Sequence, residues 1–449
     1  MDTSAKSFKL LKNNGVLSYI VPNNLLFQGE NTKTRSLLIN THCLKTVINL
    51  GDNAFENADV PTCIFVGLKG YRPNYTINFS DNRKLNVQEM DFATPQKTFL
   101  NTDVNDVPDM VIGISGKGVK LMREIETKSW KLDDIALEMA SGISTGGDKM
   151  FRIEKQFAIN NDLEQELLKP VLVGGEIDKY KIKDTEHLII YTDRNTDLKK
   201  FKNINNYLLP FKDKLITRSE AKTGIMPWYS LNRQRYPALF EEEKIIMRQT
   251  SDSIRACFDA SGFYCIDSIL VFKINPQFDI SYKYALMMLN SKLNNYVYKS
   301  ITQEEGRTFA QVKPQNVRKL FIPKISKEDQ KVFEILCDYL MFLNDENNKQ
   351  VVPGLENRAL AFFIQEVADV CVIELIYSAE MNKNKVDVLE FVKKEITSFE
   401  DLPWEVRQAR EIFETYQKWT LPNSEVRNRL KIVSVILPDT AGIILCDNV

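Results

Sequence analysis

The most glycine-rich window of the chain, ASGISTGGDKMFRI (residues 140–153), could either cradle a phosphate or turn the chain. A Walker-type loop requires GxxxxGK[ST], in which backbone N–H groups and a lysine hold the phosphates while a hydroxyl holds magnesium. Gly142 and Gly147 have the required separation, but Asp148 stands in the place of the lysine, and its carboxylate would repel a phosphate. The dinucleotide pattern GxGxxG is absent too. The window therefore predicts a glycine turn, serving as a hairpin connection, that leads into a short strand at Met150–Ile153.

Histidine and cysteine are too sparse for several kinds of chemistry. The seven cysteines are scattered without CxxC spacing, and the chain has two histidines, His42 and His187. We therefore expect no disulfide framework, no structural zinc site and no Ser/His or Cys/His nucleophile. A loose PD...ExK nuclease pattern, Pro108–Asp109 with Glu126–Lys128, places its second acid at the end of a helical segment, so we attribute it to chance.

The hydropathy of the chain predicts a cytoplasmic protein that does not contact a membrane. No run approaches 18 apolar residues, and the first 25 residues mix lysine and asparagine with apolar residues, unlike a signal peptide. Charge is unevenly distributed although the net charge is only -1. Residues 283–324 hold eight Lys and Arg against two acids, whereas residues 341–449 hold 12 against 18. A basic region of this kind is compatible with a polyanionic partner.

The elements that must position these residues predict an α/β plus α+β protein. A length of 449 residues favours two or three domains. In the first domain, strands are predicted at 15–21, 44–50 and 62–68, with a helix at 30–42. Strand 15–21 is predicted to be buried and parallel. Three strands with one helix cannot close an α/β domain, so residues 1–70 are predicted to be the end of a sheet that begins elsewhere.

The remainder of the chain is predicted to form three segments. Residues 71–129 are polar and irregular, with a possible helix at 117–127, and are interpreted as a linker. Residues 130–326 hold short predicted strands and a closing helix, namely 188–191, 244–247, 263–266, 269–272 and 282–298. Residues 327–449 form an acidic helical tail, with predicted helices at 328–344, 357–377, 386–396 and 404–418.

Several strings, taken in order, resemble one family. They are NNGVLSYIVPNNLLF (13–27), Arg35, VINLGDNAFENADVPTCIFVGLK (47–69), GISTGGDKMF (142–151), KPVLVGGEIDKY (169–180), Trp228 with Arg233, EEEKIIMRQ (241–249), LMMLNSKLNNYVY (286–298) and LFIP (320–323). Over about residues 10–325 the chain resembles the C-terminal half of TaqI-like adenine-specific DNA methyltransferases of type II restriction-modification systems. The resemblance implies a partial methyltransferase-type sheet, a mixed target-recognition domain and a C-terminal helical region.

The chain departs from this family in its catalytic motifs. Members carry an S-adenosylmethionine loop of the type FxGxG and an [N/D]PP[Y/F] motif that holds a flipped adenine. Neither is found here; the nearest strings are Val21–Asn24 and Ile274–Gln277. We therefore expect no cofactor in this chain alone, S-adenosylmethionine in the complete enzyme, and a separate catalytic half as partner besides double-stranded DNA. The alternative is a remnant or scaffold that binds a protein through its helical tail.

The resemblance directs attention to side chains that contact phosphates and base edges. Two segments are rich in such groups. The candidate DNA-binding residues are Arg307, Gln311, Lys313, Gln315, Asn316, Arg318 and Lys319 in the first segment, and Arg218, Lys222, Arg233 and Arg235 in the second. A solvated basic loop, or a core role for the neighbouring aromatics, remains the alternative. Phe55 resembles the family's adenine-stacking aromatic, with packing against the missing half as its alternative. No residue is predicted to be catalytic or to bind a metal.

Overall fold

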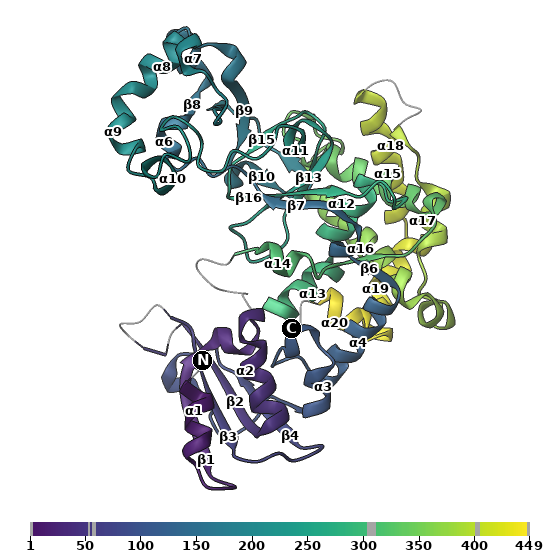
Figure 1. The fold of residues 1–449 in the computed structure, drawn as a ribbon. Helices are drawn as coiled ribbons and strands as arrows, with labels where there is room; N and C mark the ends of the chain where they lie inside the picture. Colours follow the sequence, from purple (N-terminus) through teal and green to yellow (C-terminus); the bar gives the residue numbers. More distant parts are fainter. Residues whose placement is uncertain (1–2, 53, 56–59, 303–310, 400–404, 447–449) are drawn as a thin grey trace. The chain divides into compact units, whose positions relative to one another are not determined.

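The computed structural model describes residues 3–52, 54–55, 60–302, 311–399 and 405–446 (Figure 1). Contacts group the chain into two units. The first comprises residues 1–129, 296–310 and 437–449, and the second comprises residues 130–295 and 311–436. The division into four predicted domains stays a prediction.

A five-stranded mixed sheet forms the centre of the first unit. Its strands are β1 (Val16–Pro22), β2 (Cys43–Gly51), β3 (Thr62–Leu68), β4 (Thr76–Asp81) and β5 (Lys97–Leu100), in the order β1-β3-β2-β4-β5. Strands β2 and β4 run parallel, whereas β1 and β2 both pair antiparallel with β3. The prediction of a buried parallel strand at 15–21 was wrong, because β1 is an edge strand whose alternate residues are exposed. Strands β4 and β5, which lie within residues 71–129, belong to this sheet.

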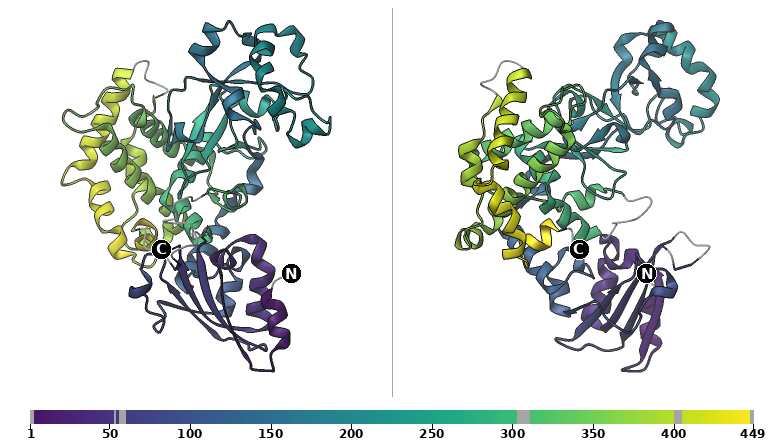
Figure 2. Two further views of the ribbon diagram at one scale, coloured as in Figure 1. Left: turned by 90° about the vertical axis from the view of Figure 1, so that its left-hand side faces the viewer. Right: turned by 180° about the vertical axis from the view of Figure 1, so that it is seen from behind.

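Helices of the first unit cover one face of this sheet. Helix α1 (Thr3–Leu10) lies along it (Figure 2), and Phe8 enters a core with Val47, Phe65 and Phe79. The predicted helix at 30–42 is broken into a 3-10 turn, helix α2 (Thr32–Ser36) and a π-helical turn. Further short elements follow: α3 (Asn101–Asn105), α4 (Gly116–Thr127) and α20 (Ala441–Leu445). Helix α4 confirms the predicted helix at 117–127.

Arg35, one of the residues that carried the family resemblance, is fully buried in this unit. Its guanidinium donates to the carbonyl oxygens of Leu25 and Gln28 at 2.7 and 2.9 Å. Two further bonds reach the carbonyl of Asp109 at 2.9 and 2.6 Å. Burial lowers the pKa of Arg35 to about 10. The side chain therefore connects helix α2 to residues 25–28 and to Asp109.

Two four-stranded sheets form the second unit. One has the order β15-β9-β12-β8 and the other β14-β13-β16-β7. The strands are β7 (Ala136–Ser141), β8 (Arg152–Glu154), β9 (Leu168–Leu172), β12 (His187–Ile190), β13 (Lys244–Arg248), β14 (Ala256–Asp259), β15 (Tyr264–Cys265) and β16 (Ile269–Ile274). Shorter pieces are β6 (Ser129–Lys131), β10 (Ile177–Asp178), β11 (Lys181–Ile182) and β17 (Phe321–Pro323). All four strands predicted in this region are present, with ends that differ by a residue or two.

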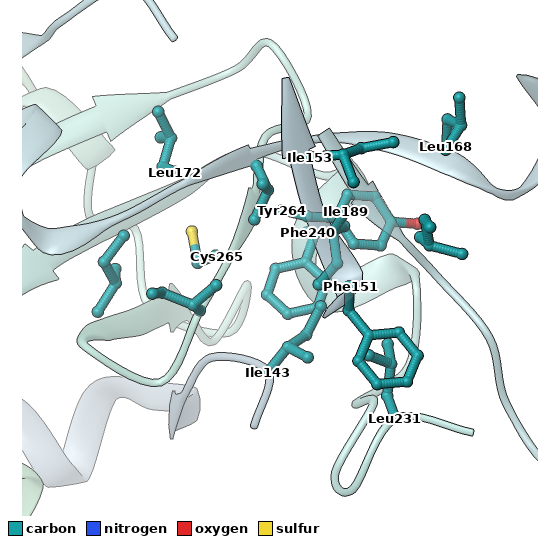
Figure 3. Close-up of a cluster of buried hydrophobic side chains, with 14 of the residues drawn as sticks. Ile143, Phe151, Ile153, Leu168, Leu172, Ile189, Leu231, Phe240, Tyr264 and Cys265 are labelled. Atoms are coloured by element: carbon teal, nitrogen blue, oxygen red, sulfur yellow. The ribbon is translucent and has the colours of Figure 1, made fainter. Parts of the chain in front are cut away.

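The predicted hairpin at the glycine-rich window was wrong. Strands β7 and β8, which flank the window, belong to different sheets, and Met150 and Phe151 lie in a short helix, α6 (Asp148–Phe151). Figure 3 shows the buried side chains beneath the window, where Ile143 and Phe151 enter the same core as Leu231. The window is therefore anchored by buried residues on both sides of its glycines.

Helices complete the second unit. They are α5 (Leu132–Ile135), α7 (Lys155–Asn160), α8 (Lys202–Leu208), α9 (Lys212–Leu215), α10 (Ser219–Lys222), α11 (Ala238–Glu241), α12 (Tyr282–Asn290), α14 (Pro314–Val317), α15 (Lys327–Asn344), α16 (Asn357–Lys383), α17 (Leu389–Glu395), α18 (Glu405–Thr420) and α19 (Glu425–Ile436). Helix α13 (Lys292–Thr302) begins in the second unit and belongs to the first unit from Tyr296 onward. Helices α15 to α19 group together in Figures 1 and 2, and α15 packs on both α12 and α16. No helix within the described ranges is long and apolar enough to cross a membrane.

The helix predicted at 282–298 is interrupted at Ser291. Its hydroxyl donates to the carbonyl of Met288 at 2.6 Å and accepts from the amide of Asn294 at 3.3 Å. The Asp369 carboxylate then accepts from the amide of Lys292 at 2.8 Å, at the start of α13. These side-chain bonds satisfy the backbone groups that a continuous helix would have paired.

Candidate nucleic-acid interface

Main-chain contacts fix the glycine-rich window at the end of β7. The amide of Gly142 donates to the Ile269 carbonyl at 2.9 Å, and the amide of Ile143 donates to the Cys265 carbonyl at 2.7 Å. A Cβ atom on Gly142 would lie 2.3 Å from that carbonyl oxygen and 2.4 Å from the carbonyl oxygen of Ile266. Glycine is therefore required here by the close approach of the β15–β16 connection.

A network of short polar contacts shapes the tip of the window. Gly146 has a φ of +69°, which favours glycine. The hydroxyl of Thr145 accepts from the amide of Gly147 at 2.9 Å and donates to the Asp148 carboxylate. Because one hydroxyl joins both partners, the carboxylate at the start of α6 is held in one orientation.

The tip lines an open pocket of about 420 Å³. Its lining includes Thr145 and four charged residues of both signs: Asp148, Lys149, Lys214 and Asp267. All four charged residues are exposed. The two lysines can contact a phosphate, whereas the two carboxylates would be repelled by it, so the pocket is suited to a ligand with both anionic and hydrogen-donating groups.

Strand β7 brings the two predicted DNA-binding segments together. Arg318 donates to the carbonyl of Met139 at 2.9 Å and pairs with Asp133. Arg235 donates to the carbonyl of Ser141 at 2.9 Å. We call this row of cations, with the pocket that continues it, the β7 surface. It joins residues that lie more than 80 positions apart in the sequence, which spacing alone could not reveal.

Arg233 extends the β7 surface toward the pocket. Its main chain exchanges two hydrogen bonds with Ser144, at 2.9 and 3.1 Å, and its side chain is exposed. Burial lowers the pKa of Arg235, and the nearby positive charge of Arg233 lowers it further. Because the two cations destabilise each other, an anion placed between them would relieve their repulsion.

Gln249, which the sequence analysis missed, ties the first segment to this surface. Its side-chain amide donates to the Asp267 carbonyl at 2.5 Å and to the Ser141 hydroxyl at 3.2 Å. Its own carbonyl accepts from the amide of Val312 at 2.7 Å, next to a bridge between Thr250 and Gln311. The exposed Gln311 side chain is thereby placed beside the ends of β7 and β13.

The other candidates of the first segment lie on or near α14. Gln315 is exposed, and Lys313, Asn316 and Lys319 are half-buried. Arg307 lies outside the described residues. The DNA-contacting role of each of these residues stays a prediction.

Arg218 and Lys222 are placed differently from each other. Arg218 donates to four main-chain carbonyls, those of Leu215, Thr145, Trp228 and Ser230, at 3.0, 2.9, 2.7 and 2.8 Å. Its guanidinium also lies 5.7 Å from the centre of the Phe151 ring. These contacts favour a role for Arg218 in holding the glycine-rich window, whereas Lys222 is exposed at the end of α10.

In the first unit, Phe55 lies between β2 and β3 with 47 % of its surface exposed. At the carboxyl ends of β1 and β2, the Asn23 amide donates to the buried amide oxygen of Asn49 at 3.1 Å. The remaining polar atoms of both side chains are inaccessible, and Asp81 is paired with Arg83 at 2.6 Å. An S-adenosylmethionine site requires accessible acceptors for its hydroxyl and amino groups, so the described residues at this edge do not fit that cofactor. No cluster of three or more His, Cys, Asp or Glu residues within the described ranges could hold a metal ion.

Two family models match consecutive parts of the chain. Residues 6–136 match the model described as N-6 DNA Methylase, and residues 169–322 match the TaqI-like C-terminal specificity domain. The second match includes Arg218, Arg233, Arg235 and Arg318. The order of the two matches agrees with the order of the motifs in the sequence.

Curated relatives point the same way. A protein of Methanocaldococcus jannaschii, RM.MjaORFECS2P, whose name describes it as a type II restriction enzyme and methyltransferase, is 25 % identical over 372 residues, 78 % of this chain and 27 % of that protein. The type II methyltransferase M.AccI of Acinetobacter calcoaceticus is 20 % identical over 379 residues, 78 % of this chain and 68 % of that protein. The chain thus spans only part of the length of either relative. These matches lend no support to the scaffold alternative.

Among solved structures, the type IIL restriction-modification enzyme MmeI in complex with DNA aligns with a TM-score of 0.49 and 11 % identity. The alignment covers 96 % of this chain and 50 % of that one.

Proposed function

Because the chain belongs to the TaqI-like adenine-specific DNA methyltransferases of restriction-modification systems, we propose that residues 130–326 are its target-recognition domain and read double-stranded DNA through the β7 surface. One observation carries this proposal. Strand β7 and the residues that follow it bind Arg318, Arg235 and Arg233 through Met139, Ser141 and Ser144, and all three arginines belong to the region that matches the specificity-domain model.

The dimensions of the β7 surface suit a duplex. An extended chain rises about 3.3 Å per residue, so the main-chain positions that anchor the three arginines, 139 to 144, span at most about 17 Å. That length corresponds to about five base pairs at 3.4 Å each. Arginine donates in a planar fork to phosphates and to guanine edges, while glutamines such as Gln311 can pair with adenine.

Salt-dependent binding tests this proposal. Each neutralised phosphate releases counterions, so the affinity for duplex DNA should fall steeply as salt rises. Arg233→Ala should weaken binding and lower the salt slope by about one unit if Arg233 contacts a phosphate. Arg358→Ala, which removes the same charge from an exposed position on α16, is the matched control and should leave both quantities unchanged. Equal effects of the two substitutions would contradict the assignment of the β7 surface.

The proposal also assigns methyl transfer to a separate catalytic half that binds S-adenosylmethionine. Strand β1 supports this division. It is the first strand in the order of the sheet, and the edge of a sheet is a template for a further strand. Val16 and Ile20 on β1 are also 59 % and 53 % exposed, so they are available to pack against another chain. In the cytoplasm the two halves would act together on DNA. The chain alone, incubated with duplex DNA and labelled S-adenosylmethionine, should transfer no methyl group. Labelled adenine in the product would contradict this division of labour.

A further inference from the structure

We propose that Asp148 is a specificity-determining residue that accepts a hydrogen bond from an exocyclic amino group in the major groove, either N4 of cytosine or N6 of adenine. The inference rests on the proposed function, because it needs duplex DNA on the β7 surface. It assigns a reading role to a residue that the sequence analysis considered only as the replacement for the Walker lysine, and that lies outside residues 169–322 matched by the specificity-domain model.

The negative charge of Asp148 is unusual on a surface that binds DNA. A surface that binds a polyanion gains affinity from cations and loses it with each carboxylate. Asp148 is nevertheless exposed in a pocket that Lys149 and Lys214 also line. A carboxylate in this position is favourable in a DNA complex only when it accepts from a donor, and the donors on base edges in the major groove are the amino groups of cytosine and adenine.

Hydrogen bonds fix the orientation of the Asp148 carboxylate. The Thr145 hydroxyl donates to one carboxylate oxygen, and this hydroxyl is itself oriented by the Gly147 amide at 2.9 Å. The second carboxylate oxygen therefore has a fixed direction before any ligand arrives. A pre-oriented acceptor discriminates better than a mobile one, because little rotational freedom is lost on binding.

Buried side chains and Arg218 hold the loop that carries Asp148. Ile143 and Phe151 are fully buried on either side of the tip (Figure 3). Arg218 donates to the carbonyl of Thr145 at 2.9 Å. The loop that carries the Asp148 carboxylate is thus held by a packed core and by the Arg218 guanidinium. A residue that recognises a base needs such support to keep its geometry.

The lysines complete the chemistry of the pocket. Lys149 follows Asp148 directly, and Lys214 comes from α9 on another part of the chain. Both can contact a phosphate that flanks the recognised base. The pocket therefore combines two cations for the backbone with a fixed acceptor for one base.

A plain structural role makes a different prediction. If Asp148 only accepted the Thr145 hydroxyl to close the turn, its replacement would change the stability of the window and leave base preference untouched. The test must therefore follow sequence preference and folding separately.

Selection of bound duplexes from a random pool provides this test, with wild type, Asp148→Asn and Asp213→Asn compared. Asp213 is the matched control, because it is exposed on α9 beside Lys214 but does not line the pocket. Asp148→Asn is isosteric and keeps an oxygen for Thr145. We expect Asp148→Asn to lose about 10-fold or more of the preference at one base-pair position, equal to about 1.4 kcal/mol, with the other positions retained. Asp213→Asn should return the wild-type consensus.

A second measurement uses the wild-type chain and so does not depend on the folding of a variant. In the selected duplex, the base at the affected position is replaced by an analogue without the amino group: purine for adenine, or 2-pyrimidinone for cytosine. Affinity should fall about 10-fold at that position only. The base whose analogue weakens binding identifies the amino group.

Three outcomes would overturn the inference. They are a wild-type consensus at every position for Asp148→Asn, an equal loss of preference for Asp213→Asn, and unchanged affinity for the analogue duplexes. Selection of no consensus by the wild-type chain is distinguishable from these, because it contradicts the proposed function itself and removes the inference with it.

Discussion

Replacing Arg218 by lysine should loosen the glycine-rich window although the charge is kept. The guanidinium spans four carbonyls that come from three parts of the chain, at Leu215, Thr145 and the pair Trp228 and Ser230. A lysine ammonium has a single nitrogen, so it cannot bridge all of them. The window, α9 and the segment after α10 would then lose their common partner.

The magnitude follows from the bonds that are lost. A lysine that keeps one or two of the four bonds leaves two or three unmade, each contributing about 1 kcal/mol, so the local opening free energy should fall by about 2 to 3 kcal/mol. This contribution is that of a neutral hydrogen bond, below the range for charged donors, because solvent screens the half-buried Arg218. This corresponds to about 30- to 140-fold faster amide exchange.

Hydrogen exchange measured by mass spectrometry is the suitable assay, because it resolves peptides and follows local opening. Peptides covering residues 142–151 and 226–233 should exchange faster in Arg218→Lys, while those from α16 should not change. Arg233→Lys is the control and should leave all of these peptides unchanged, because the Arg233 side chain is exposed. Unchanged exchange in Arg218→Lys, together with weaker DNA binding, would show that Arg218 contacts DNA and would refute this reasoning.

Three further substitutions have expected outcomes. Gly142→Ala should lower the thermal midpoint of unfolding, because its Cβ would lie 2.3 Å from the Cys265 carbonyl oxygen; an unchanged midpoint would mean that the connection yields easily. Lys244→Met should lower the free energy of unfolding in urea by about 3 to 5 kcal/mol. The Lys244 ammonium lies 2.6 Å from the Asp259 carboxylate and both side chains are 0 % exposed, so the substitution leaves a buried negative charge without its counter-charge. Burial raises the pKa of Asp369 to about 6 from 3.8. The folded state therefore binds more protons than the unfolded state between about pH 4 and 6, and stability from this group falls as pH rises through that window. Asp369→Asn should remove this loss of stability with rising pH. Between pH 4 and 7 the free energy of unfolding of the variant, measured from urea midpoints, should therefore rise by about 3 kcal/mol relative to wild type; a stability difference that does not change with pH would contradict the assignment.

Much of the local structure could be predicted because hydrophobic periodicity is a local property. The buried strands β13 and β16 and the amphipathic helix α4 were found in this way. Strand β1 was misjudged because its apolar run does not reveal that one face lacks a cover. Helix α19 was missed, because its pattern of buried residues is sparse, with only Val426 and Val433 fully covered.

The candidate interface was predicted only in pieces. Arg233, Arg235 and Arg318 were identified from local density of hydrogen-bonding groups, but their alignment along β7 depends on pairings between distant segments. Gln249 was missed because it binds Ser141, Asp267 and Val312, which are far from it or from one another in the sequence. Asp148 in the glycine-rich window was compared only with the Walker pattern, and its neighbour Lys149 was not identified as a candidate.

The central claim is that residues 130–326 read a DNA sequence. The most direct measurement is selection of bound duplexes from a random pool by the wild-type chain, at low and at moderate salt. We expect a consensus that is retained at moderate salt, because base contacts add to the salt-sensitive phosphate contacts. Recovery of no consensus at either salt concentration would contradict it.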